Sequence, residues 1–155
     1  MIRIEAPGFD PYEIEHVLLD YNGTIAFDGA LLPGVSDAIS KLASLAHVVV
    51  LTADTYGTVE EQCTPLGVEV RLFPQAGAAE FKRSYAAGLT GQVACLGNGR
   101  NDVAMFDEAA LSIAVIDAEG AYAGLLAHAD VVVRDALEGL MLLLNPDRIR
   151  ATLRS

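Results

Sequence analysis

Short apolar runs recur along the chain, and each one ends at a polar residue or at glycine. Runs of this length that are rich in Val and Leu are typical of strands covered on both faces of a sheet. The clear examples are residues 17–19, 47–51, 92–96, 111–116 and 130–133. Residues 68–73 form a weaker sixth example. The pattern therefore predicts a buried sheet.

Helical patterns occupy most of the intervals between these runs, at residues 35–45, 58–63, 78–87, 102–110 and 135–144. Alternation of strand and helix is typical of a parallel sheet with helices on both faces. We therefore expect an α/β fold, a three-layer α/β/α sandwich with a mainly parallel, Rossmann-like sheet. The length of 155 residues predicts one domain. Within it, residues 1–15 are expected to form an edge strand or hairpin and residues 145–155 a C-terminal tail.

Polar side chains follow three of the predicted strands, at Asp20, Thr52 and Asn98. Ligands of parallel α/β sheets bind beyond the carboxyl ends of the strands, so these residues are expected to meet at one edge. Asp28-Gly29, between two apolar triplets, is a strong signal for a tight two-residue hairpin. Asp20 taken alone fits either a loop carboxylate or a ligand-binding residue.

The string from Gly97 to Asp102 follows a predicted strand and opens a predicted helix. Its two glycines permit a close approach of the backbone, and Asp102 is well placed to bind a cation. The alternative is a turn in which Asn101 or Asp102 caps the helix. That alternative accounts for one residue of the string and leaves the others unexplained.

The composition limits the classes of partner. The chain is 52% hydrophobic and carries a net charge of −11, so it lacks the basic footprint that nucleic-acid binding needs. Anionic membrane surfaces are unsuitable partners for the same reason. Residues 137–144 are too short for a bilayer span and residues 1–8 do not resemble a signal peptide. We expect a soluble, cytoplasmic protein without membrane insertion, whose apolar content favours a homo-oligomer.

The cysteines and histidines carry no motif of their own. Cys63 and Cys95 are too few for a disulfide framework and are expected to be inert packing residues. His16, His47 and His128 have no metal-ligand partner at a suitable spacing, so we expect structural roles for all three.

Two segments together carry a family resemblance: Asp20-Tyr21-Asn22-Gly23-Thr24 and the string Gly97–Asp102. They resemble motifs of the haloacid-dehalogenase-like (HAD) superfamily of phosphatases and phosphotransferases, whose first motif reads Asp-x-Asp-x-Thr/Val. The resemblance covers residues 17–133, with the motifs in the expected order. It looks closest to the small soluble proteins related to the phosphorylation domain of P-type ATPases.

The resemblance implies that Asp20 attacks phosphorus and forms an aspartyl-phosphate. Thr52 would then donate a hydrogen bond to the phosphoryl group, and Lys82 would neutralise the reacting groups, with Arg83 as a rival for that position. The implied catalytic residues are Asp20, Asn22, Thr52 and Lys82. The implied phosphate-binding residues are Asn22, Gly23, Thr52, Ala53 and Lys82. The implied cofactor is Mg²⁺, with Asp20, the backbone carbonyl of Asn22, Asn98 and Asp102 as ligands.

The chain departs from the superfamily pattern at Asn22 and Asn98. Phosphatases carry a carboxylate at the first of these positions, where it protonates the leaving oxygen and later activates water. An amide cannot exchange a proton, and general acid–base catalysis is worth ~10²–10⁴ in rate. Asn98 replaces a metal-binding Asp, so weaker Mg²⁺ binding is expected. The expectation is a slow enzyme, and the alternative is a non-catalytic phosphate- or metal-binding regulatory module related to the P-type ATPase phosphorylation domain.

Substrate choice in this superfamily depends on cap insertions. Only 27 residues separate Thr24 from Thr52, and 29 separate Thr52 from Lys82. The predicted helices and strands already fill both intervals, so no cap domain is expected. The partner is then a small phosphorylated substrate or a phosphoprotein that reaches an open site, and the sequence does not identify it further.

Overall fold

The computed structural model of the protein describes residues 1–54 and 57–155. Its centre is a sheet with the strand order β6-β5-β2-β7-β8-β9, in which neighbouring strands are parallel, and β1 adds to β2 in antiparallel orientation. The strands are β1 (Ile2–Ile4), β2 (Tyr12–Asp20), β5 (His47–Thr52), β6 (Glu69–Leu72), β7 (Gln92–Gly97), β8 (Leu111–Val115) and β9 (Val131–Val133).

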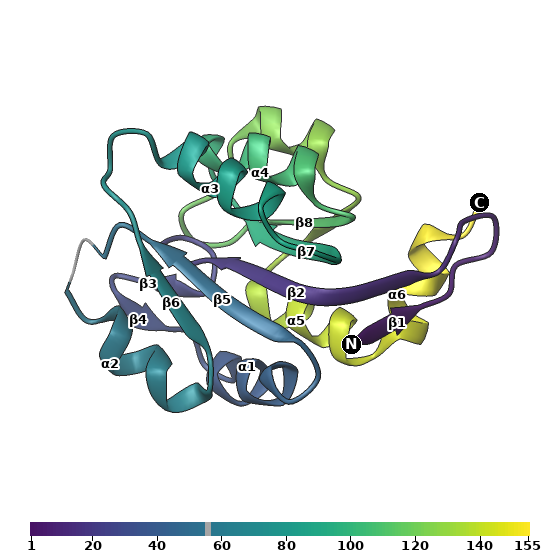
Figure 1. Cartoon of the computed structure of the whole chain (residues 1–155), viewed down its shortest axis with the longest axis horizontal. Coiled ribbons are helices and arrows are strands. Elements are labelled where there is room, and N and C mark those ends of the chain that lie inside the picture. Colours follow the sequence, from purple (N-terminus) through teal and green to yellow (C-terminus); the bar gives the residue numbers. More distant parts are fainter. Residues whose placement is uncertain (55–56) are drawn as a thin grey trace.

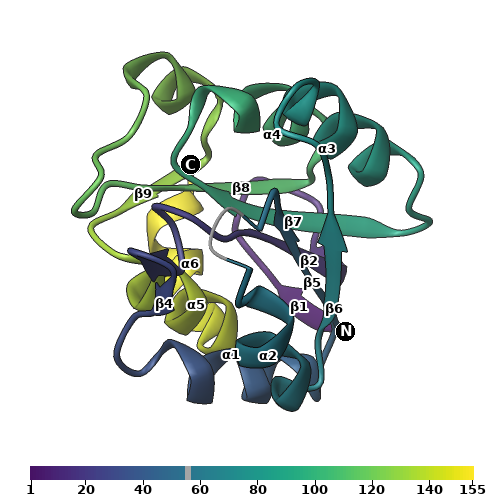
Figure 2. The ribbon, with the colours of Figure 1, turned by 90° about the vertical axis from the view of Figure 1, so that its left-hand side faces the viewer.

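Helices cover both faces of the sheet, so the predicted three-layer α/β/α sandwich is confirmed. Figure 2 shows α3 and α4 on one side of the sheet and α1, α2 and α5 on the other. The helices are α1 (Val35–Ala43), α2 (Val59–Cys63), α3 (Ala78–Ala87), α4 (Val103–Glu108), α5 (Ala136–Leu144) and α6 (Pro146–Leu153). Three short 3₁₀ helices are η1 (Thr64–Leu66), η2 (Arg100–Asp102) and η3 (Ala123–His128).

The middle strand β2 explains why the apolar runs do not alternate with polar residues. Val17 and Leu19 point into the core beneath α1 and α5, whereas Leu18 points into the second core beneath α3 and α4. All three side chains are fully buried. The first half of β2, from Tyr12, pairs with β1, and exposed residues alternate there with buried ones. The strand is therefore longer than its apolar run (Figure 1).

The predicted hairpin is confirmed. The strands β3 (Ala26–Phe27) and β4 (Ala30–Leu31) pair on either side of Asp28 and Gly29. These two residues have φ angles of 50° and 81°, and positive values at both positions are what a tight type I′ turn requires. The hairpin follows the end of β2 directly, so it lies beside the carboxyl edge of the sheet.

The helix predicted over residues 102–110 is present but shorter, as α4 at Val103–Glu108. The segment begins with the 3₁₀ turn η2, and α4 ends at Glu108 because Ala109 is extended and the N–H of Ala110 donates to the carbonyl of Val93 in β7. No cap domain interrupts the described parts of the chain. No described helix combines the length and the apolarity needed to cross a lipid bilayer.

Candidate active site

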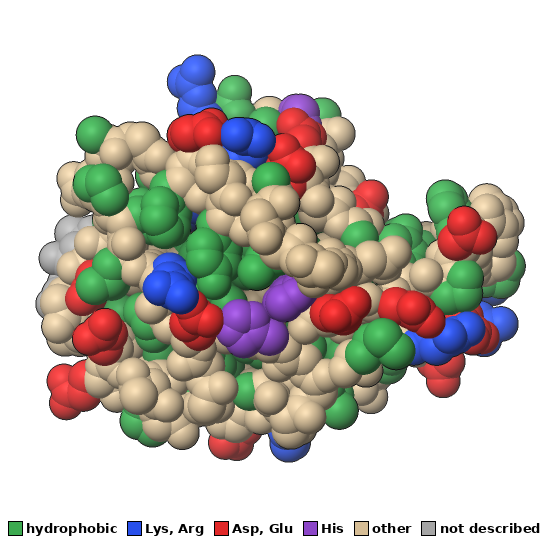
Figure 3. Space-filling view, in the orientation of Figure 1, with side chains coloured by type: hydrophobic (Ala, Val, Ile, Leu, Met, Phe, Trp, Pro, Cys, Tyr) green, Lys and Arg blue, Asp and Glu red, His purple; other side chains and the backbone are tan. Residues whose placement is uncertain are grey.

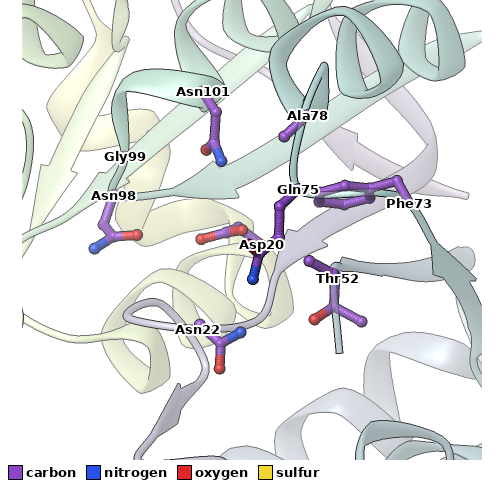
Figure 4. Close-up of a pocket in the computed structure, with 10 residues that line it drawn as sticks. Asp20, Asn22, Thr52, Phe73, Gln75, Ala78, Asn98, Gly99 and Asn101 are labelled. Carbon is purple, nitrogen blue, oxygen red and sulfur yellow. The ribbon is translucent and has the colours of Figure 1, made fainter. Parts of the chain in front are cut away.

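The carboxyl ends of three adjacent strands, β5, β2 and β7, place Thr52, Asp20 and Asn98 around one cavity. The cavity has a volume of about 320 Å³. Figure 4 shows the side chains of Asp20, Thr52, Asn98 and Asn101 arranged around it. Its lining residues are Asp20, Asn22, Thr52, Ala53, Phe73, Gln75, Ala78, Asn98, Gly99 and Asn101. The topology alone thus brings together residues that are far apart in the sequence.

Lys82 connects the two carboxylates of the site. Its side chain is fully buried, and Nζ lies 2.6 Å from Asp20 Oδ1, 2.7 Å from Asp102 Oδ1 and 3.2 Å from Asn101 Oδ1. An ammonium group has three hydrogens, and these contacts use all of them. Burial by itself would lower the pKa of Lys82, but the charges of Asp20 and Asp102 outweigh burial and raise it. Lys82 is therefore a fixed cation beside Asp20.

Arg83, the rival candidate, points away from the site. Its guanidinium pairs with Glu80 at 2.8 Å and with Glu108 at 3.1 Å, and 40% of its side chain is exposed. Adjacent residues of a helix point about 100° apart, so only one of the pair can face Asp20. Lys82 is the one that faces Asp20, because its side chain is buried and contacts that carboxylate.

The turn after β7 holds Asp102 in place. Asp102 Oδ2 accepts hydrogen bonds from the backbone N–H groups of Asn98, at 3.1 Å, and Gly99, at 2.9 Å. A Cβ on Gly97 would lie 2.5 Å from Asp102 Cγ, so this position requires glycine. Burial and then the nearby charge of Asp20 raise the pKa of Asp102 despite its contact with Lys82. A cation that stabilises the ionised carboxylate would relieve this cost.

Thr24 and Asn98 complete the surroundings of Asp20. The Thr24 hydroxyl is buried and donates to Asp20 Oδ2 at 2.9 Å, with Asn98 Oδ1 3.2 Å from the same hydroxyl oxygen. Asn98 Nδ2 donates to the carbonyl of Gly120 at 3.1 Å. Because a carbonyl only accepts, this bond fixes the amide orientation and turns the Asn98 oxygen toward Thr24 and the cavity. The cavity is therefore lined by the carboxylate of Asp20 and the neutral oxygen of Asn98, whereas Asp102 is fully buried and does not line it.

Comparisons with solved structures identify this arrangement of strands. A phosphatase for 3-deoxy-D-manno-octulosonate 8-phosphate from Moraxella catarrhalis, in complex with magnesium, phosphate and the sugar, superposes with a TM-score of 0.66 and 18% identity over 91% of this chain and 94% of that one. A protein described as a HAD family hydrolase from Streptomyces avermitilis MA-4680 gives 0.67 and 19%, over 89% and 90%. The chain therefore shares the fold of these proteins. A zinc-transporting PIB-type ATPase gives a TM-score of 0.63 and 27% identity, over 79% of this chain and 20% of the ATPase.

Curated relatives of this chain carry no assigned activity. The uncharacterized protein MJ0073 of Methanocaldococcus jannaschii is 41% identical over 63 residues, which span 41% of this chain and 68% of the relative. The uncharacterized protein MJ0072 of the same organism is 46% identical over 39 residues, 25% of this chain and 89% of the relative. No protein-family model matches the chain.

Not every predicted site residue has the expected surroundings. The N–H of Gly23 donates to the carbonyl of Ala26 at 2.9 Å, so it is not available to the phosphate that it was predicted to bind. Gly23 instead permits close packing, because a Cβ there would lie 2.5 Å from Asn98 Nδ2 and 2.7 Å from Glu119 Oε2. Asn22, Thr52 and Ala53, which were predicted to bind phosphate, line the cavity. Thr52 Oγ1 accepts from the N–H of Asp54 at 2.9 Å, which leaves its own hydrogen to donate.

Sequence reasoning did not assign Thr24, Phe73 and Asn101. Thr24 belongs to the first motif, and its spacing of four residues from Asp20 was the available signal. The ring of Phe73 lies 5.5 Å from Lys82 Nζ, and Asn101 accepts from the same atom. Neither contact has a sequence signal, because each depends on where α3 packs.

The oxygen donors fit a hard divalent cation. Among the described residues no group of three or more His, Cys, Asp or Glu side chains is arranged as a metal site. Mg²⁺ is commonly held by one or two carboxylates with waters and substrate phosphates. Asp20 lines the cavity and meets that requirement, whereas both oxygens of the buried Asp102 already accept hydrogen bonds, from Lys82 and from the backbone of the turn after β7. The oxygen of Asn98 and the backbone carbonyl of Asn22 are further donors of the right class. Mg²⁺ would supply charge neutralisation for a phosphoryl group beside Asp20.

Proposed function

We propose that the protein is a Mg²⁺-dependent phosphohydrolase or phosphotransferase that forms an aspartyl-phosphate on Asp20. The observation that carries the proposal is the setting of Asp20: it ends the middle strand, faces the cavity, and has Lys82 on Oδ1 and Thr24 on Oδ2. Both contacts stabilise the ionised carboxylate in an orientation that leaves it in contact with the cavity. A carboxylate nucleophile needs this combination of charge and access.

The reaction divides into two steps. Asp20 attacks phosphorus, a P–O bond to Asp20 forms, and the P–O bond to the leaving group breaks with its electron pair on the leaving oxygen. The Thr52 hydroxyl stabilises a phosphoryl oxygen by a hydrogen bond, and Lys82, whose three hydrogens are already used, stabilises the transferring group by its charge alone. Water or another acceptor then attacks the phosphoryl group, releases Asp20 and loses a proton to solvent.

Asn22 sets the rate of both steps. It lines the cavity two residues after Asp20 and has no proton to give to the leaving oxygen or to take from water. Loss of acid–base catalysis at such a position costs ~10²–10⁴ in rate. Phosphoryl donors that carry a good leaving group, such as acyl phosphates, are therefore favoured. The phosphoenzyme is long-lived for the same reason. The proteins that share the fold include a phosphatase and an ATPase, which supports phosphoryl transfer as the class of reaction.

Asn22 and Asn98 also favour a second candidate, a phosphate- or metal-binding regulatory module without turnover. Both positions carry an amide where an ionisable carboxylate would increase activity or metal affinity. This candidate predicts that phosphate and Mg²⁺ bind and that no covalent adduct forms.

Phosphate release from p-nitrophenyl phosphate tests the proposal. We expect slow release that needs Mg²⁺, stops with EDTA and is absent in Asp20→Asn. Asp28→Asn is the matched control, because Asp28 is exposed in the hairpin turn and Asn-Gly suits the same turn. Equal activity in Asp20→Asn and the wild type would exclude Asp20 as the nucleophile.

A further inference from the structure

Two histidines meet on the sheet away from the cavity. The parallel register of β2 and β5 pairs His16 with His47, and their Nδ1 atoms lie 3.1 Å apart. Asp20 lies four positions after His16 on β2, which is about 13 Å along a strand. Figure 3 shows histidine surface with carboxylates near it on the face in view. The pair is thus a separate feature from the site around Asp20.

The outer nitrogen of each ring carries a hydrogen. His16 Nε2 lies 2.9 Å from the carbonyl oxygen of Thr90, which can only accept. His47 Nε2 lies 2.7 Å from Glu69 Oε2. Burial acts to raise the pKa of Glu69, but the hydrogen bond from His47 and the charge of Arg71 outweigh it and lower the pKa. Glu69 is therefore an ionised acceptor, and His47 Nε2 is a donor.

These outer contacts determine what the inner nitrogens can do. A neutral imidazole with its hydrogen on Nε2 has a lone pair on Nδ1. His16 and His47 therefore direct two lone pairs at each other across 3.1 Å, an arrangement that is repulsive unless an electrophile lies between or beside them. The electrophile is either a single proton or a metal ion.

We propose that His16 and His47 bind a divalent transition-metal ion of the Zn²⁺, Ni²⁺ and Cu²⁺ class through their Nδ1 atoms. Two nitrogens about 2.0–2.1 Å from a tetrahedral Zn²⁺ lie about 3.3 Å apart, close to the separation of this pair. Imidazole is a preferred ligand of these metals. Metal-bound histidines also usually donate their outer N–H to a carboxylate or a backbone carbonyl, as His47 and His16 do.

The surroundings of the pair favour a cation. Glu69 supplies a negative charge next to His47 through one carboxylate oxygen and pairs with Arg71 through the other. Glu15 lies at an irregularity of β2, where the register with β7 shifts, and its carboxylate packs over Gly91. The described residues hold no third side chain arranged as a ligand, and 43% of the His47 side chain is exposed. The remaining coordination positions thus belong to water, and the metal is expected to exchange with the solution.

Calorimetric titration with Ni²⁺ in excess Mg²⁺ tests this site, because Mg²⁺ occupies the carboxylate sites. The wild type is expected to bind one Ni²⁺ per chain, and His16→Gln and His47→Gln are expected to lose this binding. His128→Gln is the matched control, since His128 pairs only with Asp107 among the described residues, at 2.6 Å, and should bind as the wild type does. Glu69→Gln should weaken binding about 10–100-fold.

Equal Ni²⁺ binding by the wild type and His16→Gln would overturn the proposal and leave a shared proton as the electrophile. Circular dichroism checks that each variant is folded. A second measurement needs no variant: the electron paramagnetic resonance spectrum of the Cu²⁺-loaded wild type should show coupling to two imidazole nitrogens. Coupling to fewer than two would contradict the proposed site.

Discussion

Lys82 separates two carboxylates that would otherwise face each other in a buried site. Its Nζ lies within 2.7 Å of an oxygen of both Asp20 and Asp102, and Asp102 is fully buried. Removing one member of a buried ion pair leaves the others without compensation, at a cost of about 3–5 kcal/mol. Lys82 therefore acts on the stability of the fold as well as on the charge of the site.

Replacing Lys82 by Gln is expected to lower the free energy of unfolding by about 3–5 kcal/mol, because two buried carboxylates lose their counter-charge. Added Mg²⁺ should restore part of the lost stability, since this cation can compensate the carboxylates in place of the missing ammonium group. Urea denaturation followed by circular dichroism, with and without Mg²⁺, measures both effects. Arg83→Gln is the control on the same helix and should change stability little, because its ion pairs are exposed. Equal losses in the two variants would contradict this account of the site.

Replacing Asn22 by Asp restores a group that can exchange a proton at the cavity. Turnover of an alkyl phosphate, whose leaving group needs protonation, is expected to rise ~10²–10⁴-fold. Turnover of p-nitrophenyl phosphate should rise less, because its leaving group departs without an acid. Steady-state rates on both substrates measure the difference. An unchanged or lower rate on the alkyl phosphate would show that Asn22 does not limit the reaction.

The residues that end strands could be predicted from the apolar pattern, whereas Lys82 was predicted only through the family resemblance, with Arg83 as a rival. Asp20, Thr52 and Asn98 follow apolar runs, and the rule for parallel sheets places them at one edge. Lys82 and Arg83 are neighbours on one helix, and only the packing of α3 determines which is buried. The contact between His16 and His47 was missed because it depends on the register of two strands.

At the scale of elements, one side chain of α2 holds the hairpin beside the cavity. Gln62 Nε2 donates to the carbonyl of Gly29 at 2.6 Å, and the N–H of Leu31 donates to Gln62 Oε1 at 3.1 Å. The Tyr21 hydroxyl donates to the same Gly29 carbonyl at 2.9 Å. The hairpin is therefore fixed at its turn and at its second strand.

Replacing Gln62 by Ala removes both of its bonds to the hairpin and leaves the N–H of Leu31 without this partner. Each lost hydrogen bond costs about 0.5–1.5 kcal/mol. We expect faster amide exchange at Leu31 with little change in the central strands, measured by hydrogen–deuterium exchange and NMR. Glu61→Ala, an exposed neighbour on α2, is the control. Unchanged exchange at Leu31 in the Gln62 variant would show that α2 does not hold the hairpin.

Elements were predictable where burial is uniform and less so where it changes along the element. The buried strands β5, β7 and β8 lie within one residue of their apolar runs. The start of β2 lies in the segment predicted as an edge strand or hairpin, and its continuity with the apolar run was missed because Glu13 and Glu15 are exposed beside β1. The helix predicted over residues 102–110 was too long, because Asp102 bonds the preceding turn and Ala110 already pairs with β7.

At the scale of the whole molecule, the charge and the open site set the requirements for a substrate. The chain has a net charge of −11, so an anionic phosphate is repelled over most of the surface. Two carboxylates and one lysine leave the site itself negative. A divalent cation beside Asp20 and Asp102 would make the charge of the site positive. Binding of an anionic phosphate is therefore expected to depend on Mg²⁺.

The central claim is that Asp20 accepts a phosphoryl group, and intact mass spectrometry tests it most directly. The protein is incubated with Mg²⁺ and acetyl phosphate, quenched in acid at a series of times, and weighed. We predict one phosphoryl group on the wild type and on Asp28→Asn, removable by hydroxylamine as an acyl phosphate, and none on Asp20→Asn. No adduct and no phosphate release from the wild type at any time, or an equal adduct on Asp20→Asn, would contradict the claim.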